Sequence, residues 1–280
     1  MKIVRTIQEL RKAVTAARKK GKRIGFVPTM GALHEGHLSL IRRGRKETGF
    51  VVVSLFVNPI QFNNRADLKK YPRPLQKDAR LSASAGADLI FAPSAAEIYP
   101  AGFQTYVEVT ELTRHWEGTS RPGHFRGVTT VVAKLFNLVQ PDIAYFGQKD
   151  AQQARVVRQM VRDLGFPLEV RVLPTVREPN GLALSSRNAR LSPTERKASS
   201  VLFRALQTGG RLIEWPHRRK NEILRRMRQV IRQAPGSRIE YIAIADPDTL
   251  EPMEKIRKPA LLMLAVRIGG TRLIDCLEVK

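Results

Sequence analysis

The chain has 280 residues, 42% of them hydrophobic, which is enough to bury one large core or two modest ones. Its 49 Lys and Arg against 25 Asp and Glu give a net charge of +24, a balance that can accompany a nucleic-acid partner. The single cysteine, Cys276, excludes an internal disulfide framework and a cysteine-rich metal site. It also favours a reducing compartment, for which the cytoplasm is the default.

Neither an export signal nor a membrane helix is expected. Residues Met1 to Lys22 carry charges at frequent intervals, without the apolar centre of a signal peptide. The longest later apolar run, Ala260 to Val266, is far shorter than the roughly 20 residues that a helix needs to span a bilayer.

The N-terminal two thirds of the chain alternate between strand and helix signals. Apolar runs predict strands at residues 24–27, 51–57, 89–92, 106–109, 143–146 and 168–173. Helices are predicted between the Thr6–Glu9 capping box and Gly21, over residues 35–44, 74–85 and 128–139, and after the turn at Gly147. This recurrence predicts an α/β fold with an open, mostly parallel, Rossmann-like sheet, which binds ligands at the carboxyl ends of its strands.

Beyond Arg187 the alternation of strand and helix signals ends. Helical patterns over residues 193–209 and 218–233 are followed by three strands, 239–245, 260–268 and 271–279, the last two joined by a tight turn at Gly269-Gly270. We expect one domain over residues 1–182 and a smaller α+β domain with an antiparallel sheet over 183–280. A hinge between Gly181 and Asn188 would let the second domain act as a lid that keeps water from a reactive intermediate.

The stretch Pro28 to Leu40 is the first place to look for chemistry. A helix starting at Glu35 points its unpaired N–H groups and the positive end of its dipole into the preceding loop, where phosphate oxygens bind well. His34 and His37 are three residues apart and project from one face of the first turn. Histidine can donate to charge that develops on a phosphate without carrying a fixed charge.

Weaker signals lie in the later loops. Leu184 to Asn188 offers two hydroxyls and a guanidinium suited to a polyphosphate, although a helix cap beside a surface arginine has the same pattern. Lys149 is a second candidate cation or a solvated lysine, and Asp150 either orients a nucleotide hydroxyl or caps a helix. Gln61 and Gln153 fit the hydroxyl and carboxylate of a small ligand.

Seven stretches, in this order, resemble the pantothenate synthetase family, whose members join pantoate to β-alanine with ATP. They are Pro28 to His37, Phe56 to Phe62, Tyr71 to Arg73, Ser120 to Gly127, Leu135 to Asp142, Phe146 to Asp150 with Gln152-Gln153, and Gly181 to Asn188. The resemblance runs from about Ile24 to the hairpin near Asp275.

The resemblance implies a role for each matching residue. His37 would donate a proton, and His34, Lys149 and Arg187 would stabilise the phosphates. The implied ATP contacts are Met30, Gly31, Ala32, Leu33, His34, Glu35, Gly36, His37, Gly147, Gln148, Lys149, Asp150, Val176, Leu184, Ser185, Ser186 and Arg187. Gln61 would bind pantoate and later β-alanine, and Gln153 would bind pantoate. Asn58 and Asp78 fit the same site, Asp78 as the candidate for the Mg²⁺ or amine environment.

The resemblance also implies Mg²⁺ with ATP as a substrate, a pantoyl-adenylate intermediate, and a cytoplasmic homodimer that assembles through the N-terminal domain. We expect no nucleic-acid partner, because aromatic residues at 6% offer little for base stacking and the charge is dispersed. The chain departs from the family at Ala151, where many members have an aromatic residue, and at Glu178-Pro179-Asn180.

Two rival functions share part of the pattern. A nucleotidylyltransferase has the same His-x-Gly-His turn but transfers AMP to a phosphate and stops there. An RNA-binding protein that keeps an inactive ligase fold would explain the charge. Amide formation with β-alanine distinguishes the first from a ligase, and salt-dependent RNA binding without ATP turnover would favour the second.

Overall fold

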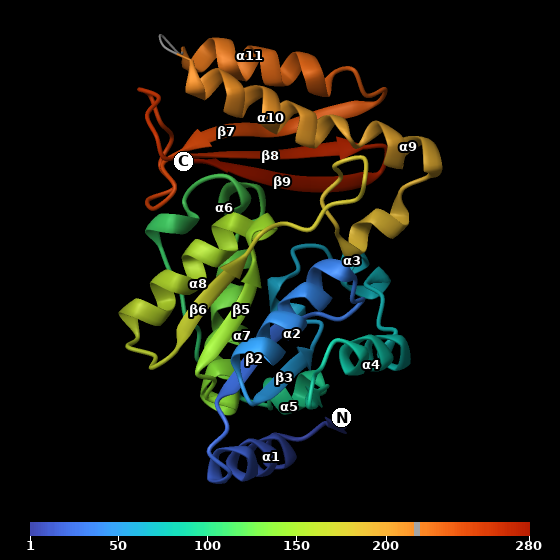
Figure 1. The fold of residues 1–280 in the computed structure, drawn as a ribbon, viewed down its shortest axis with the longest axis vertical. Helices are drawn as coiled ribbons and strands as arrows, with labels where there is room; N and C mark the ends of the chain where they lie inside the picture. Colours follow the sequence, from blue (N-terminus) through green and yellow to red (C-terminus); the bar gives the residue numbers. More distant parts are fainter. Residues whose placement is uncertain (216–218) are drawn as a thin grey trace. The chain divides into compact units, whose positions relative to one another are not determined.

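The computed structural model describes residues 1–215 and 219–280 (Figure 1). The described chain forms two compact units. Unit 1 comprises residues 1–113, 117–147 and 153–173, and unit 2 comprises residues 114–116, 148–152 and 174–280. Unit 2 therefore begins before the expected boundary at 182/183 and includes two short earlier segments. The functional division at that boundary stays a prediction.

Unit 1 is built on a six-stranded sheet whose strands run in the order β1-β4-β3-β2-β5-β6, with every pair parallel. The strands are β1 (Lys2–Val4), β2 (Ile24–Thr29), β3 (Phe50–Leu55), β4 (Leu89–Phe91), β5 (Ile143–Gly147) and β6 (Glu169–Leu173). The central strands are buried on both faces, which explains their unbroken β-branched and aromatic runs. The predicted Rossmann-like fold class is confirmed.

The strand order changes direction between β2 and β5. From β2 the chain proceeds outward through β3 and β4, whereas β5 and β6 lie on the other side of β2. At such a topological switch point the loops after the two central strands part and leave a crevice at the carboxyl edge of the sheet. The loop after β2 carries two of the predicted phosphate contacts, His34 and His37.

Helices cover both faces of this sheet. One core lies among the sheet, α1, α7 and α8, and contains Phe26, Phe136 and Met160. A second core, with Ile41 and Tyr145, packs beneath α2 on the opposite face. The helical segments of this region are α1 (Ile7–Lys19), α2 (Glu35–Glu47), η1 (Pro59–Gln61), α3 (Arg65–Lys70), α4 (Leu75–Ser84), α5 (Ala95–Ile98), η2 (Glu111–Thr113), α6 (Glu117–Ser120), α7 (His124–Val139), η3 (Gln148–Asp150) and α8 (Ala151–Asp163).

Most local predictions for unit 1 are confirmed. Thr6 and Glu9 form the predicted capping box, and Gly21 follows α1 with φ at +68°. The expected strand at Tyr106–Val109 is wrong, because this segment is a loop. Its Val107 N–H donates to the Thr130 hydroxyl on α7 at 3.0 Å, so a helix side chain takes the place of a neighbouring strand.

Unit 2 is a three-stranded antiparallel sheet covered by helices. The strands β7 (Ser237–Ala245), β8 (Ala260–Ile268) and β9 (Thr271–Val279) pair in sequence order, and the predicted antiparallel strands and tight hairpin are confirmed. Figure 1 shows α10 (Val201–Glu214) and α11 (Lys220–Ile231) side by side along the sheet, and their apolar faces share one core with Leu262, Leu264 and Val266 of β8. Two shorter helical segments precede them, η4 (Ser186–Arg190) and α9 (Pro193–Ala198).

The predicted helix over residues 193–209 is wrong as a single element. It divides into α9 and α10 at Ser199-Ser200, where both hydroxyls bond to backbone carbonyls of the preceding turn. Such local bonds compete with a continuous helix. The expected start of the next helix at Arg218 lies outside the described residues. Within those residues, no helix is long and apolar enough to cross a membrane.

Candidate nucleotide and substrate site

The loop after β2 is held in a conformation that few residues adopt. Thr29 at the end of β2 donates from its hydroxyl to Ser54 O at 2.7 Å, and the same hydroxyl accepts from Gly31 N–H at 3.1 Å. Gly31 and Ala32 then have φ values of +82° and +52°. Left-handed backbone is costly for alanine, so this loop needs support from outside it.

Asp78 on α4 supplies that support. One carboxylate oxygen accepts from Ala32 N–H at 2.8 Å, and the other accepts from Leu33 N–H at 2.8 Å. The side chain is buried, and burial raises the pKa of Asp78 while the two N–H donors oppose this shift. Asp78 therefore fixes the loop that leads into α2, a task that the sequence did not indicate. Its metal-binding role stays a prediction.

The two histidines lie together at the start of α2. Their ring centroids are 4.1 Å apart, and His34 N–H donates to Nδ1 of His37 at 3.4 Å. An acceptor at Nδ1 favours the neutral tautomer with its proton on Nε2, which makes Nε2 a donor. A Cβ on Gly36 would lie 3.0 Å from two atoms of the His34 ring. Glycine at this position therefore makes room for the ring.

Gln61 approaches the same loop from the carboxyl end of β3. It lies in η1, is buried, and places its Nε2 3.1 Å from Sδ of Met30. Asn58, at 1% exposure, donates from Nδ2 to Oε1 of Gln61 at 2.9 Å. The structure thus brings together Met30, Asn58 and Gln61, which the sequence assigned to one site from separate segments.

A cavity of about 320 Å³ opens beside this group. Its lining includes Met30, Gly31 and Asp78 together with residues that follow β3 and β4. It therefore occupies the carboxyl edge of the sheet, where ligands bind in this fold class. Gln153 belongs to the first turn of α8 and is half-buried, and the described contacts do not join it to Gln61.

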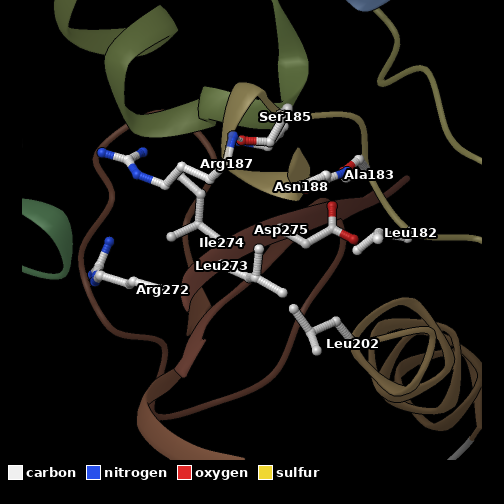
Figure 2. Close-up of a pocket in the computed structure, with 11 residues that line it drawn as sticks. Leu182, Ala183, Ser185, Arg187, Asn188, Leu202, Arg272, Leu273, Ile274 and Asp275 are labelled. Atoms are coloured by element: carbon white, nitrogen blue, oxygen red, sulfur yellow. Dashed lines mark hydrogen bonds between the residues drawn. The ribbon is translucent and has the colours of Figure 1, made fainter. Parts of the chain in front are cut away.

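A second set of predicted residues meets within unit 2. Lys149, Ser185 and Arg187 line one pocket, together with Asn188, Arg272 and Asp275 (Figure 2). Figure 2 shows the guanidinium groups of Arg187 and Arg272 on one side of this pocket and Asp275 on the other. Three basic side chains contribute to the lining, and the space between them, about 10 Å³, is the size of a single water molecule.

The carboxylate in this lining, that of Asp275, is already neutralised. Asp275, at 3% exposure, makes two hydrogen bonds with Arg177, at 2.6 and 3.0 Å. Burial raises the pKa of Asp275, and the Arg177 guanidinium opposes that shift. Arg177 in turn lies with its guanidinium carbon 3.8 Å from the centre of the Phe203 ring. Two of the basic side chains are paired as well: Arg272 donates from Nε to a Glu240 carboxylate oxygen at 2.7 Å, and Lys149 Nζ lies 3.7 Å from an Asp150 oxygen.

The segment that carries Ser185 and Arg187 is organised locally. Leu184 N–H donates to Val176 O at 3.0 Å, which closes a narrow loop between two predicted ATP contacts. Within it Gly181 has φ of +91°. The Ser185 hydroxyl accepts from Arg187 N–H at 3.2 Å, so the predicted alternative of a cap is part of its role.

Sequence reasoning missed Arg272 and Asp275. Both lie on β9, just after the hairpin turn that was predicted correctly. The available signal was an acidic residue in the middle of a largely apolar strand, Thr271-Arg-Leu-Ile-Asp275. A buried carboxylate needs a partner, and Arg177 was the unrecognised one.

The fold defines a class of protein: α/β enzymes with a Rossmann-like sheet, which bind nucleotides and other ligands in the loops at the carboxyl edge of the sheet. The chain belongs to the pantoate–β-alanine ligase family, whose model matches residues 2–278. It is therefore a ligase that forms pantothenate in an ATP-dependent reaction.

Relatives cover nearly the whole chain. Pantothenate synthetase from Moorella thermoacetica is 55% identical over 275 residues, covering 98% of this chain and 97% of the relative. A crystal structure of pantothenate synthetase from Thermus thermophilus matches with a TM-score of 0.94 at 51% identity, covering 100% of this chain and 99% of that one. The Francisella tularensis ligase, crystallised with Beta-gamma ATP and Beta-alanine, matches with a TM-score of 0.82 at 36% identity, covering 99% and 97%.

Proposed function

We propose that this protein condenses pantoate with β-alanine by way of a pantoyl adenylate, and that the residues placed above perform the two steps. The observation that carries the proposal is the joint placement of His34, His37, Met30 and Gln61 at the carboxyl edge of the sheet. Donors suited to phosphate and donors suited to a small acid lie in the loops of neighbouring strands. The individual roles are those implied by the family.

In the first step a pantoate carboxylate oxygen attacks the α-phosphorus of ATP. A C–O–P linkage forms, and the bond to pyrophosphate breaks. His37 Nε2 is the proposed donor to the phosphate oxygens, with His34 beside it, while Lys149 and Arg187 spread the charge of the departing pyrophosphate. These groups are already in position before the reaction begins, and they act by electrostatic stabilisation of the transition state.

In the second step the free amine of β-alanine attacks the acyl carbon. A C–N bond forms, the C–O bond to AMP breaks, and the proton lost by the amine passes to solvent. AMP is a far better leaving group than the oxide ion that direct attack on a carboxylate would expel. The proposed binding residues for the two acids are Gln61 and Gln153, and the family role of Asn58 in this site is proposed to be indirect, through its hydrogen bond to Gln61. Neither step requires a covalent enzyme nucleophile.

We propose that Mg²⁺ accompanies ATP and is bound mainly by phosphate oxygens, the usual arrangement for this ion. The described side chains do not form a protein-built cage. No group of three His, Cys, Asp or Glu in residues 1–215 and 219–280 is arranged to hold a metal. Both oxygens of Asp78 also accept backbone N–H bonds, so Asp78 is a poor candidate for direct coordination. No step above depends on the ion.

We further propose a cytoplasmic homodimer that uses no nucleic acid. The single cysteine supports the reducing compartment, and the family resemblance supports the dimer. The low aromatic content argues against base stacking.

Pyrophosphate release tests the proposed function. The protein is assayed with ATP and pantoate, with and without β-alanine, beside the His37→Ala variant. We expect pantoate-dependent pyrophosphate that turns over only when β-alanine is present, formation of pantothenate, and a large loss of rate in the variant. Pyrophosphate without pantothenate would contradict the second step, and no pyrophosphate at all would contradict the proposal.

A further inference from the structure

The side chain of Asn58 uses every hydrogen-bonding group it has. Its Nδ2 donates to Oε1 of Gln61 at 2.9 Å and to the backbone oxygen of Gly127 at 2.9 Å. Its Oδ1 accepts from the hydroxyl of Tyr99 at 2.8 Å. The side chain is 1% exposed, so water does not compete for these groups. A complete set of partners in a buried place leaves one orientation for the amide.

The direction of these bonds is set by the carbonyl of Gly127. A carbonyl oxygen only accepts, so the nitrogen of Asn58 must face it. The oxygen of Asn58 then faces Tyr99, whose hydroxyl must donate. The second N–H of Asn58 requires an acceptor, and this places Oε1 of Gln61 toward Asn58. The Nε2 group of Gln61 is thereby turned the other way, toward Met30.

The backbone of Gln61 is fixed as well. His124 on α7 places its Nδ1 2.9 Å from Gln61 O. Gly127 on the same helix packs so closely that a Cβ there would lie 2.6 Å from Ile60 O and 2.7 Å from Gln61 Cα. With the backbone held, the orientation of the amide is the remaining freedom of Gln61, and the Asn58 network removes it.

We propose that Tyr99 is a positioning residue which, through Asn58, holds Gln61 with its amide nitrogen toward the substrates. This proposal rests on the proposed function, in which Gln61 contacts pantoate and then β-alanine. A site that offers N–H donors at this point selects a ligand group that accepts hydrogen bonds: a carboxylate or hydroxyl oxygen. It rejects an ammonium group at the same place.

The consequence for β-alanine is specific. Its carboxylate can accept from Gln61, whereas its ammonium group cannot. Gln61 therefore takes hold of the carboxylate end and leaves the amine end for attack on the acyl carbon. The amide nitrogen carries two N–H groups, so it can serve an oxygen of the bound pantoyl group and, in the second step, the β-alanine carboxylate.

Tyr99 can be changed without disturbing its packing. Its ring stacks edge-on with Phe103 at 4.9 Å and contacts Phe56 at 6.1 Å between centroids. Phenylalanine keeps these contacts and removes only the hydroxyl. Burial raises the pKa of Tyr99 far above neutral pH, so the hydroxyl retains its proton and remains a donor. Tyr106, whose side chain is exposed, provides a matched Tyr→Phe control.

The test compares steady-state constants of Tyr99→Phe and Tyr106→Phe with those of the unchanged protein. Loss of one buried hydrogen bond predicts a roughly 5- to 10-fold higher KM for pantoate and for β-alanine in Tyr99→Phe. KM for ATP should stay unchanged, whereas the melting temperature of Tyr99→Phe should fall, because the buried Oδ1 of Asn58 loses its donor. Tyr106→Phe should behave like the unchanged protein. The proposal would be overturned if KM for both acids in Tyr99→Phe matched that of the unchanged protein. It would also be overturned if KM for ATP rose by the same factor as KM for the acids.

The variant Gln61→Glu is a second test of the amide orientation, and it does not depend on whether Tyr99→Phe folds. A carboxylate has acceptors only, so the variant should lose affinity for both acids by a larger factor. KM values within about twofold of the original would show that an acceptor faces the substrates, and would overturn the proposal. If the unchanged protein releases no pyrophosphate, the proposed function itself fails. That outcome is separate from both variants.

Discussion

Gly36 illustrates how a single residue separates stability from activity. Its missing side chain leaves space for the His34 ring, because a Cβ would approach two ring atoms to 3.0 Å. Gly36 also lies in the first turn of α2, where alanine is a better helix former by up to about 1 kcal/mol. Gly36→Ala should therefore leave the melting temperature unchanged or raise it, while kcat falls because the ring moves.

The matched control is Gly270→Ala. A Cβ at Gly270 would meet nothing within 4 Å, and the residue lies in the hairpin turn of unit 2. Steady-state kinetics and thermal melting of the two variants measure the two effects independently. A Gly36→Ala enzyme with unchanged kcat would show that the position of the His34 ring does not matter for the reaction.

At the level of single residues, the sequence predicted the turn with its two histidines but not what supports it. The spacing of His34 and His37 is a local property, and a glycine-flanked helix start indicates their setting. Asp78 supports the loop from 46 residues away, through backbone N–H groups that have no signature of their own. Tyr99 and Arg272 were missed for the same reason.

Among the structural elements, the narrow loop between Val176 and Leu184 depends on Glu178. Its carboxylate bonds to the Arg196 guanidinium at 2.7 and 2.9 Å and to Asn188 at 3.3 Å. Arg196 is the main cause of a pKa of Glu178 below its ordinary value of 4.5. The loop also contains Asn180, whose side chain accepts from Leu182 N–H. The departure from the family pattern at these positions thus has a structural role.

This lowered pKa predicts acid sensitivity. A carboxyl with a depressed pKa stabilises the fold at pH values above about 4.5, and the contribution is lost as pH falls through the lower folded pKa. Glu178→Gln should cost about 1 kcal/mol or less at neutral pH, because Arg196 is half exposed.

Chemical denaturation at a series of pH values checks this. The difference in unfolding free energy between the unchanged protein and Glu178→Gln should shrink as pH falls below 4.5. A difference that stays constant through that range would contradict the assignment of the ion pair.

Element prediction succeeded where one periodicity dominated. The buried strands β2, β3 and β5 and the hairpin of β8 and β9 follow directly from apolar runs and turn residues. It failed where side chains intervene: Thr130 takes up the backbone N–H of Val107, and the hydroxyls of Ser199 and Ser200 divide a helix. These contacts depend on tertiary placement or on competition that a hydropathy pattern does not reveal.

For the whole molecule, the net charge of +24 should affect how ATP is captured. A positive field raises the local concentration of an anionic substrate, and salt screens this field over about 10 Å at 0.1 M. KM for ATP should therefore rise by about twofold or more between roughly 0.02 and 0.3 M NaCl. KM for β-alanine, which is a zwitterion, serves as the internal control. Equal salt dependence of both constants would contradict electrostatic capture.

The central claim, that the carboxylate of pantoate is activated as an adenylate, is tested most directly by following its oxygen. Pantoate labelled with oxygen-18 in the carboxylate is converted with ATP and β-alanine, and the nucleotide product is analysed by mass spectrometry. The account predicts AMP that carries one labelled oxygen, because the bridging oxygen of the adenylate leaves with phosphorus when the amine attacks. Unlabelled AMP, or ADP with labelled phosphate, would contradict it.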